Sequence, residues 1–141
     1  MLEASKDMKD KLFAFMNNYV QKQFSNEKRL KNLLHHGYAN GYVAVPPSHP
    51  LHGMDYCDAD AHIAVWGGLT FGESMQEMKE GLADVFAECV ECINFECIDE
   101  IPNDYWVFGF DTLHFNDSDA HDRDWCIHET NALMKQLEKV N

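Results

Sequence analysis

The chain has 141 residues, of which 45% are hydrophobic and 12% aromatic, and this composition excludes an intrinsically disordered protein. No apolar run reaches transmembrane length and the first residues are polar, so we expect neither a membrane span nor a signal peptide. Five cysteines without a secretory context favour free thiols in a cytoplasm over a disulfide framework. A chain of this length suits a single domain over residues 1–141.

The formal net charge of -13 is concentrated in one third of the chain. Residues 73–124 hold fifteen acidic residues against Lys79 and Arg123, whereas residues 1–36 have a balance of +3. An acidic surface of this kind repels nucleic-acid phosphates and suits a basic partner, including a protein whose basic groove normally holds DNA or RNA. Solubility is an equally good reason for the same charge.

The N-terminal part of the chain predicts two helices. Ser5 can cap the first one. Its apolar residues recur at steps of three and four: Met8, Leu12, Phe15, Met16, Tyr19, Val20 and Phe24. A second helix is expected over residues 27–35, with Gly37 as its C-terminal stop.

Strands and a long loop are expected next. Gly41 to Val45 alternates and is β-branched, and Pro46 stops it. The loop over residues 48–60 is of a length that often carries function, and the prolines around His49 should hold that side chain with little freedom. His62 to Trp66 predicts a second strand.

The most acidic element is a helix expected over residues 73–93, within an inserted acidic helical segment over 73–101. Apolar residues keep helical spacing on one side and acidic residues occupy the other. The carboxylates expected to bind a partner are Glu77, Glu80, Asp84 and Glu88. Among its three cysteines, Cys89, Cys92 and Cys97, buried thiols are favoured over a zinc site because no fourth ligand follows at a suitable spacing.

A buried central strand and a closing helix complete the expected fold. The apolar run over residues 105–110 has strand length, and Asp122 can cap the last helix. The expected buried side of that helix is Trp125, Ile127, His128, Ala132, Leu133, Leu137 and Val140. The resulting class is α+β, with a mostly antiparallel sheet of three to four strands packed with N-terminal, acidic and C-terminal helices.

Candidate metal ligands lie at the end of the central strand. Asp111, His114 and Asp117 are three residues apart, and carboxylate oxygen and neutral imidazole nitrogen suit a divalent cation such as zinc. If the loop at 48–60 folds over this strand end, His49 joins Asp111 and His114, which leaves a fourth position for water, His52 or Asp117. The alternative is that the aspartates cap turns and His114 is a surface residue.

Common catalytic signatures are missing from the sequence. It has no phosphate-binding glycine loop, no Gly-x-Ser-x-Gly elbow and no His-Glu-x-x-His motif, so a structural metal is favoured over a catalytic one. Basic patches with interleaved aromatics are also missing, which argues against direct nucleic-acid binding. Two alternatives stay open: a small metal-dependent hydrolase of phosphoester or nucleotide substrates with Asp117 as base, and a nucleotide-binding protein that stacks a base on Trp66, Trp106 or Tyr56.

Short motifs within residues 40–72 and 104–138 carry a resemblance to a known family. They are Gly41-Tyr42-Val43-Ala44-Val45-Pro46, His49-Pro50, Gly53, Gly67-Gly68-Leu69-Thr70-Phe71, Gly109-Phe110-Asp111-Thr112-Leu113-His114, Asp117 and, in the last helix, Glu129, Leu133 and Leu137. They resemble a family of small proteins found in bacteriophages and prophages. The family pattern has a histidine before Gly-Gly-Leu-Thr where this chain has Trp66, and this departure bears on any metal site that needs that histidine.

The resemblance implies a phage context and therefore the cytoplasm of a bacterial host. Small, strongly acidic phage proteins include anti-CRISPR inhibitors, some with a structural metal, which bind a Cas9-type effector and keep target DNA out of its positively charged channel. We therefore expect a phage-encoded inhibitor of a host defence protein, with the acidic helix and the loop at 116–124 on a basic surface of the effector.

Overall fold

The computed structural model describes residues 11–17, 40–65, 68–81, 90–111 and 123–140. Its elements in chain order are β1 (Phe13–Asn17), β2 (Asn40–Val45), α4 (Tyr56–Ala59), the 3-10 turn η1 (Asp60–His62), β3 (Phe71–Ser74), α5 (Met75–Gly81), β4 (Val90–Cys92), the 3-10 turn η2 (Ile98–Glu100), β5 (Trp106–Asp111) and α7 (Arg123–Lys139). Within these ranges, no helix has the length and apolar character to cross a membrane. The α+β class is confirmed, and the sheet has five strands where three to four were expected.

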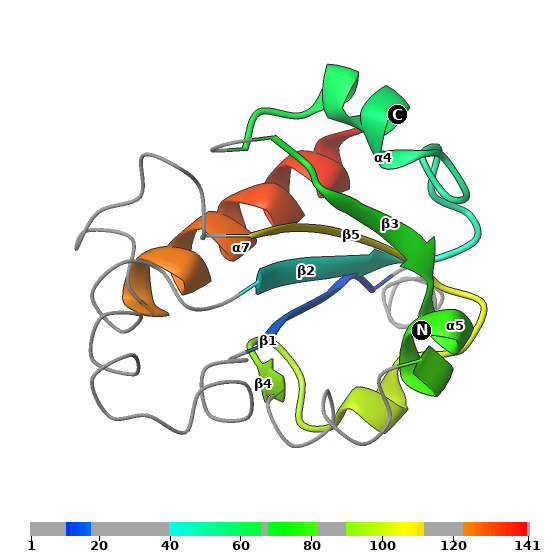
Figure 1. Ribbon diagram of the computed structural model, residues 1–141, viewed down its shortest axis with the longest axis vertical. Helices are drawn as coiled ribbons and strands as arrows, with labels where there is room; N and C mark the ends of the chain where they lie inside the picture. The colour runs from blue at the N-terminus through cyan, green and yellow to red at the C-terminus, as the bar shows by residue number, and fades with distance from the viewer. Residues whose placement is uncertain (1–10, 18–39, 66–67, 82–89, 112–122, 141) are drawn as a thin grey trace, which may run out of the picture.

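The five strands form one sheet in the order β3-β5-β2-β1-β4, with β2 at its centre (Figure 1). Each neighbouring pair is antiparallel. Asn40 of β2 lies opposite Asp111 of β5, and Val45 lies opposite Trp106. The predicted strands at 41–45 and 105–110 are therefore confirmed, and they lie side by side.

Phe13–Asn17 form strand β1, where the sequence predicts the first helix. Residues Leu12 to Met16 are all buried, and Ala14, Phe15 and Met16 are 0% exposed. A strand covered on both faces has a continuous apolar run instead of alternation, and such a run also contains helical spacings by chance. The prediction is wrong over 13–17, and the rest of that helix and the helix at 27–35 lie outside the described residues.

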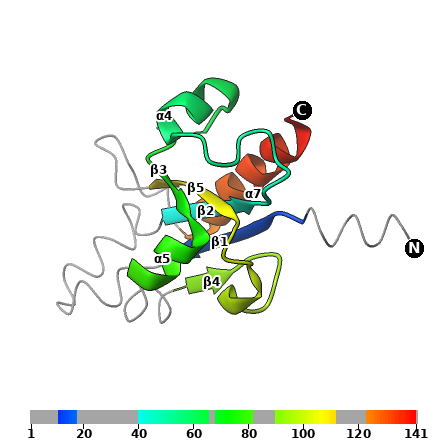
Figure 2. The ribbon, with the colours of Figure 1, turned by 90° about the vertical axis from the view of Figure 1, so that its right-hand side faces the viewer.

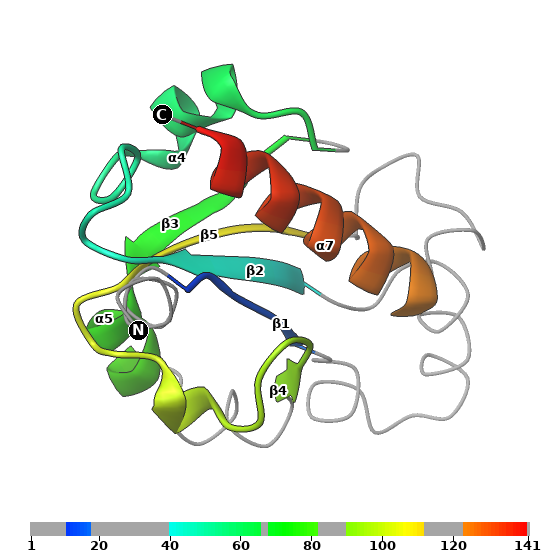
Figure 3. The same ribbon diagram turned by 180° about the vertical axis from the view of Figure 1, so that it is seen from behind.

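Helix α7 covers one face of the sheet, where it crosses β1 and β2 (Figure 3). Alternate residues of three strands point towards it, among them Ala14, Val43 and Phe108. From the helix, Cys126, Leu133 and Leu137 enter the same cluster. The expected helix is confirmed, but His128 is exposed and the buried positions near it are Cys126 and Thr130.

The opposite face of the sheet carries a second core cluster. Phe13, Phe15, Tyr42 and Val107 lie on this face. Met75 and Met78 from α5 pack against them together with Ile101, which follows η2. In Figure 2, α5 and the segment after β4 lie on the side of the sheet away from α7.

Gly41 allows helix α7 to approach β2 closely. A Cβ atom at this position would overlap the Thr130 hydroxyl and lie 2.6 Å from atoms of the Phe110 ring. The Thr130 hydroxyl donates a 2.6 Å hydrogen bond to the Cys126 carbonyl one turn earlier. Glycine is therefore needed for steric reasons at the point where helix, β2 and β5 meet.

Two further predictions differ from the structure. His62 belongs to η1 and residues 63–65 form no strand, because the backbone of Ala64 exchanges two hydrogen bonds with the Gln136 side chain of α7 instead of pairing with another strand. The acidic helix is α5 over Met75–Gly81, and Val90–Cys92 is strand β4 at the sheet edge next to β1, not a continuation of that helix. Residues 82–89 lie outside the described ranges.

Candidate functional site

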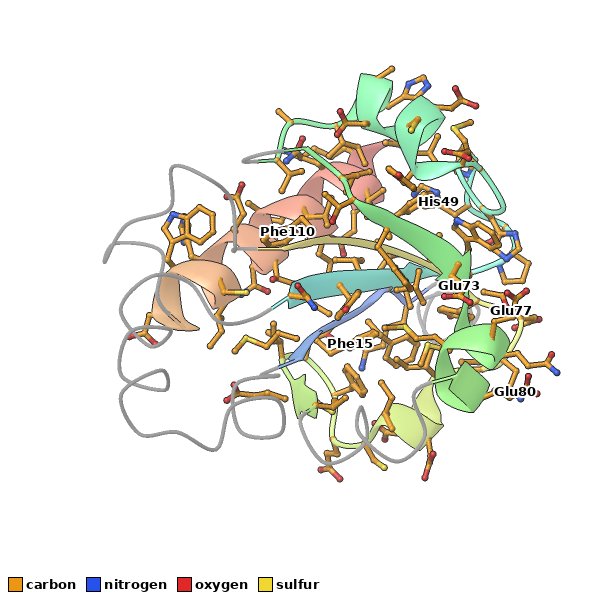
Figure 4. All side chains as sticks on the ribbon, viewed as in Figure 1. Phe15, His49, Glu73, Glu77, Glu80 and Phe110 are labelled. Atoms are coloured by element: carbon orange, nitrogen blue, oxygen red, sulfur yellow. The ribbon has the colours of Figure 1, made fainter. Side chains whose placement is uncertain are left out.

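His49 is held by two hydrogen bonds within the protein. Its Nε2 lies 2.7 Å from the carbonyl oxygen of Leu137 near the end of α7, and its Nδ1 accepts a 3.0 Å hydrogen bond from the Leu51 amide. Both ring nitrogens are therefore occupied, and the lone pair that a metal would need is used by Leu51. The restricted histidine that the prolines predicted is present (Figure 4), but its hydrogen bonds are to the protein's own backbone.

The structure does not bring His49 and Asp111 together. His49 follows the end of β2, whereas Asp111 lies opposite Asn40 at the start of β2. The five residue steps between Asn40 and Val45 separate the two ends by about 17 Å. The expectation that the loop covers the end of β5 is wrong: it lies at the beginning of β5, because the two strands run antiparallel.

A metal held without His49 stays a prediction. His114 and Asp117 lie outside the described residues, and the described residues contain no group of three potential ligands. We expect any metal in the purified protein to be kept by His49→Ala and lost by His114→Ala. Elemental analysis for zinc, manganese, iron and nickel checks this. Loss of metal in His49→Ala would show that the two sheet ends share a ligand set.

The predicted partner-binding carboxylates lie partly on α5. Glu77 and Glu80 are exposed on this helix (Figure 4), whereas Asp84 and Glu88 lie outside the described residues. The Ser74 hydroxyl accepts a 3.1 Å hydrogen bond from the Glu77 amide and caps the helix. Ser74 is the last residue of β3, and Ser74 and Glu77 have the Ser-x-x-Glu spacing of a capping box. Helix α5 therefore begins directly after the strand.

Glu73 extends the acidic group from α5 onto the sheet. It lies in β3, and partial burial, a hydrogen bond from its protonated carboxyl group to the Glu77 side chain and the negative charge of Glu77 raise its pKa. The last two causes reflect two carboxyl groups that lie close together. The side chains of Glu73, Glu77 and Glu80 lie near one another in Figure 4.

A second set of carboxylates follows β4 in the chain. The exposed members are Glu96, Asp99, Glu100 and Asp104. Backbone amides of Cys97 and Glu96 donate hydrogen bonds to Glu100 and lower its pKa, which keeps this carboxylate charged. These residues belong to the charge that the sequence concentrates in residues 73–124, but they were not among the carboxylates expected to bind a partner, although three of them stand within five residues.

Lys79 joins the two acidic sets. Its ammonium donates to the Ile101 carbonyl at 2.7 Å and to the Asn103 side-chain oxygen at 2.9 Å. The Gln76 amide also donates to the Asn103 carbonyl at 3.1 Å. Helix α5 and residues 98–104 are therefore adjacent. We refer to Glu73, Glu77, Glu80, Asp99, Glu100 and Asp104 as the acidic surface.

The burial of the cysteine thiols agrees only partly with the prediction. Cys126 is fully buried, and its burial raises its pKa to about 12, so it stays protonated and unreactive at neutral pH. Cys97 is exposed and Cys92 is half-buried, so the prediction of buried thiols is wrong for Cys97, which caps the turn η2 instead of entering the core. Cys89 lies outside the described residues.

Comparison with known proteins gave no relative for this arrangement. No protein-family model matches the chain, and neither the curated proteins nor the solved structures contain a significant match.

Proposed function

We propose that this protein inhibits a host defence protein in a phage-infected bacterium by covering a basic surface of that protein with its acidic surface. An anti-CRISPR protein that acts on a Cas9-type effector fits this description. The observation that supports the proposal is the placement of exposed carboxylates on two adjacent segments, α5 and residues 98–104. Among the described residues of 73–104, Lys79 is the only basic residue, and its ammonium is engaged by the Ile101 carbonyl and the Asn103 side chain.

The physical basis of the proposed inhibition is competition for positive charge. A Cas9-type effector holds its nucleic acids in a positively charged channel. A disordered acidic tail would lose conformational entropy when it binds in such a channel. Carboxylates on a capped helix are already ordered and avoid most of this cost. The same charges repel DNA, so an inhibitor bound in this way keeps the duplex away from the channel.

The test is neutralisation of the two exposed carboxylates of α5. We expect the double variant Glu77→Gln, Glu80→Gln to bind a Cas9-type effector about tenfold more weakly at moderate salt, mainly through slower association. Surface plasmon resonance at two salt concentrations measures both the affinity and its salt dependence. DNA cleavage by the effector in the presence of each variant measures inhibition.

A matched control removes carboxylates elsewhere. Asp58 on α4 and Glu138 on α7 are exposed and lie outside the acidic surface. The Asp58→Asn, Glu138→Gln variant should bind as the unmodified protein does. Unchanged affinity of the Glu77→Gln, Glu80→Gln variant, or an equal loss in the control, would contradict the proposal.

A further inference from the structure

Strand β3 forms one edge of the sheet. It pairs with β5 from Phe71 opposite Gly109 to Ser74 opposite Trp106, and no described strand lies on its other side (Figure 1). All four residues of β3 are half-buried, whereas five of the six residues of the central strand β2 are buried. An edge strand of this kind presents unpaired backbone groups on its outer side.

The pairing register shows which backbone groups of β3 lie on this outer side. The Met75 amide, directly after the strand, donates a 2.8 Å hydrogen bond to the Tyr105 carbonyl. Because the direction of these groups alternates along a strand, residues 71 and 73 also point theirs at β5. The N–H and C=O groups of Gly72 and the N–H group of Ser74 therefore point outwards. Among the described residues, none forms a hydrogen bond with these three groups.

One face of this open edge is aromatic. Tyr56 at the start of α4 lies directly beside Gly72, since a Cβ atom at Gly72 would be 3.3 Å from both the Cβ atom and the amide nitrogen of Tyr56. Tyr56 is 37% exposed and is the one exposed large hydrophobic residue in the described ranges. A strand placed next to β3 would therefore meet an accessible aromatic ring on this face.

The other face of the open edge is acidic. Successive side chains of a strand point to opposite faces, so Glu73 points away from Tyr56. Its carboxyl group forms a hydrogen bond with Glu77 of α5, and Figure 4 shows Glu80 close to both. Figures 1 and 2 place α4 and α5 on opposite sides of β3. The two faces of one open edge thus differ in chemistry.

We propose that the open edge of β3 binds an extended segment of the partner protein as an added antiparallel strand, in which basic residues alternate with apolar ones. In such a pair, directly opposite side chains share a face with Cβ atoms about 5 Å apart. The apolar residue opposite Gly72 then packs beside Tyr56, and its basic neighbours lie beside Glu73 and α5. The inference rests on the proposed function in taking the partner to be basic, and it adds that backbone hydrogen bonds align the partner with the acidic surface.

A second copy of this chain fits the same edge less well. Two β3 strands in antiparallel pairing would bring Glu73 of both copies to one face of the joined sheet, with Glu77 and Glu80 of each copy nearby. Strand β3 contains no basic residue to offset this charge. Like charges on neighbouring strands are destabilising, so charge complementarity favours a basic segment over self-association.

The test uses the peptide Lys-Val-Lys-Val-Lys-Val, titrated into the full chain and followed by NMR. The amide signals of Gly72 and Ser74 should shift, whereas the Cys92 amide on the other edge strand, β4, should not. Methylation of the valine amide nitrogens removes the N–H group that would donate to the Gly72 carbonyl and keeps the two strands apart. We expect this change to weaken binding about tenfold or more.

The matched control is the peptide of the same charge in which the amide nitrogens of the second and third lysines are methylated instead. In the proposed pairing these amides point away from β3, so the affinity should stay within about twofold of the unmodified peptide. Unchanged Gly72 and Ser74 signals, or equal weakening by the two methylations, would overturn the proposal. Dimerisation of the protein alone through β3, measured by analytical ultracentrifugation and NMR, would do the same.

This titration contains no effector protein, so its outcome is separate from that of the proposed function. Loss of effector binding in the Glu77→Gln, Glu80→Gln variant together with a peptide insensitive to valine methylation would retain the acidic surface and reject the added strand. Methylation-sensitive binding at Gly72 together with unchanged effector affinity in that variant would support the added strand and reject the proposed inhibition.

Discussion

Replacement of Ala14 by glutamate is expected to prevent the protein from folding. Ala14 is 0% exposed and lies in β1 on the face of the sheet that α7 covers. A carboxylate there would have no cationic partner among the residues of that cluster. An unpaired buried charge costs several kcal/mol, which is comparable to the whole stability of a domain. Circular dichroism should show an unfolded chain, or one that refolds only at low pH.

The same substitution at an exposed alanine is the matched control. Ala61 lies in η1 and is exposed, so Ala61→Glu should change the free energy of unfolding by no more than about 0.5 kcal/mol. The two variants also distinguish strand β1 from the helix that the sequence predicts. In that helix Ala14 would lie outside the apolar stripe, where a glutamate would be tolerated. A folded Ala14→Glu variant of nearly normal stability would contradict the placement of β1.

Truncation of Phe15 to alanine is expected to remove about 3–5 kcal/mol from the free energy of unfolding. Phe15 is 0% exposed on the opposite face of β1. Its ring stacks on Tyr42 with centroids 5.3 Å apart and meets the edge of Phe95 at 6.1 Å. The substitution removes the apolar transfer energy and these aromatic contacts and leaves a cavity. Urea denaturation measures the change through the unfolding midpoint.

Tyr56 offers a control of similar size. It is 37% exposed on α4, so Tyr56→Ala should cost about 1 kcal/mol or less. If Phe15→Ala were no more destabilising than Tyr56→Ala, the second core cluster around α5 would not be closed as described.

The sequence predicts those elements whose residue pattern fits either a strand or a helix but not both. Residues 41–45 contain two valines and end at two prolines, and residues 123–139 repeat apolar positions with helical spacing, so β2 and α7 could be assigned directly. Strand β1 could not, because it is buried on both faces like β2 but has no β-branched residue and no flanking proline to mark it as a strand. Val90–Cys92 is too short for any pattern, and only its pairing with β1 makes it a strand.

The candidate metal site depended on the relative direction of β2 and β5, which the sequence does not give. His49 follows β2 and Asp111 is the last residue of β5, so a parallel pairing would have placed both at the same end of the two strands. The antiparallel pairing of β2 with β5 places them at opposite ends. The restricted position of His49 was predictable from its prolines, but its backbone partner Leu137 lies 88 residues away.

The acidic surface was easier to anticipate. Exposure of Glu77 and Glu80 follows from the polar side of an amphipathic pattern, and the structure agrees. The adjacency of residues 98–104 was not predictable, because it depends on hydrogen bonds from Lys79 to Ile101 and Asn103, which lie more than twenty residues further along the chain.

The order of the strands also has a consequence during synthesis of the chain. None of the described pairings is a tight hairpin: Phe15 pairs with Tyr42 and with Cys92, and Asn40 pairs with Asp111. Distant pairings close large loops before they gain contacts and therefore form slowly. Of the five strands, β1 leaves the ribosome first. Its two apolar faces stay uncovered until α5, and later α7, have been synthesised. The apolar segment Leu12–Met16 therefore needs protection from aggregation until α5 and α7 have been synthesised.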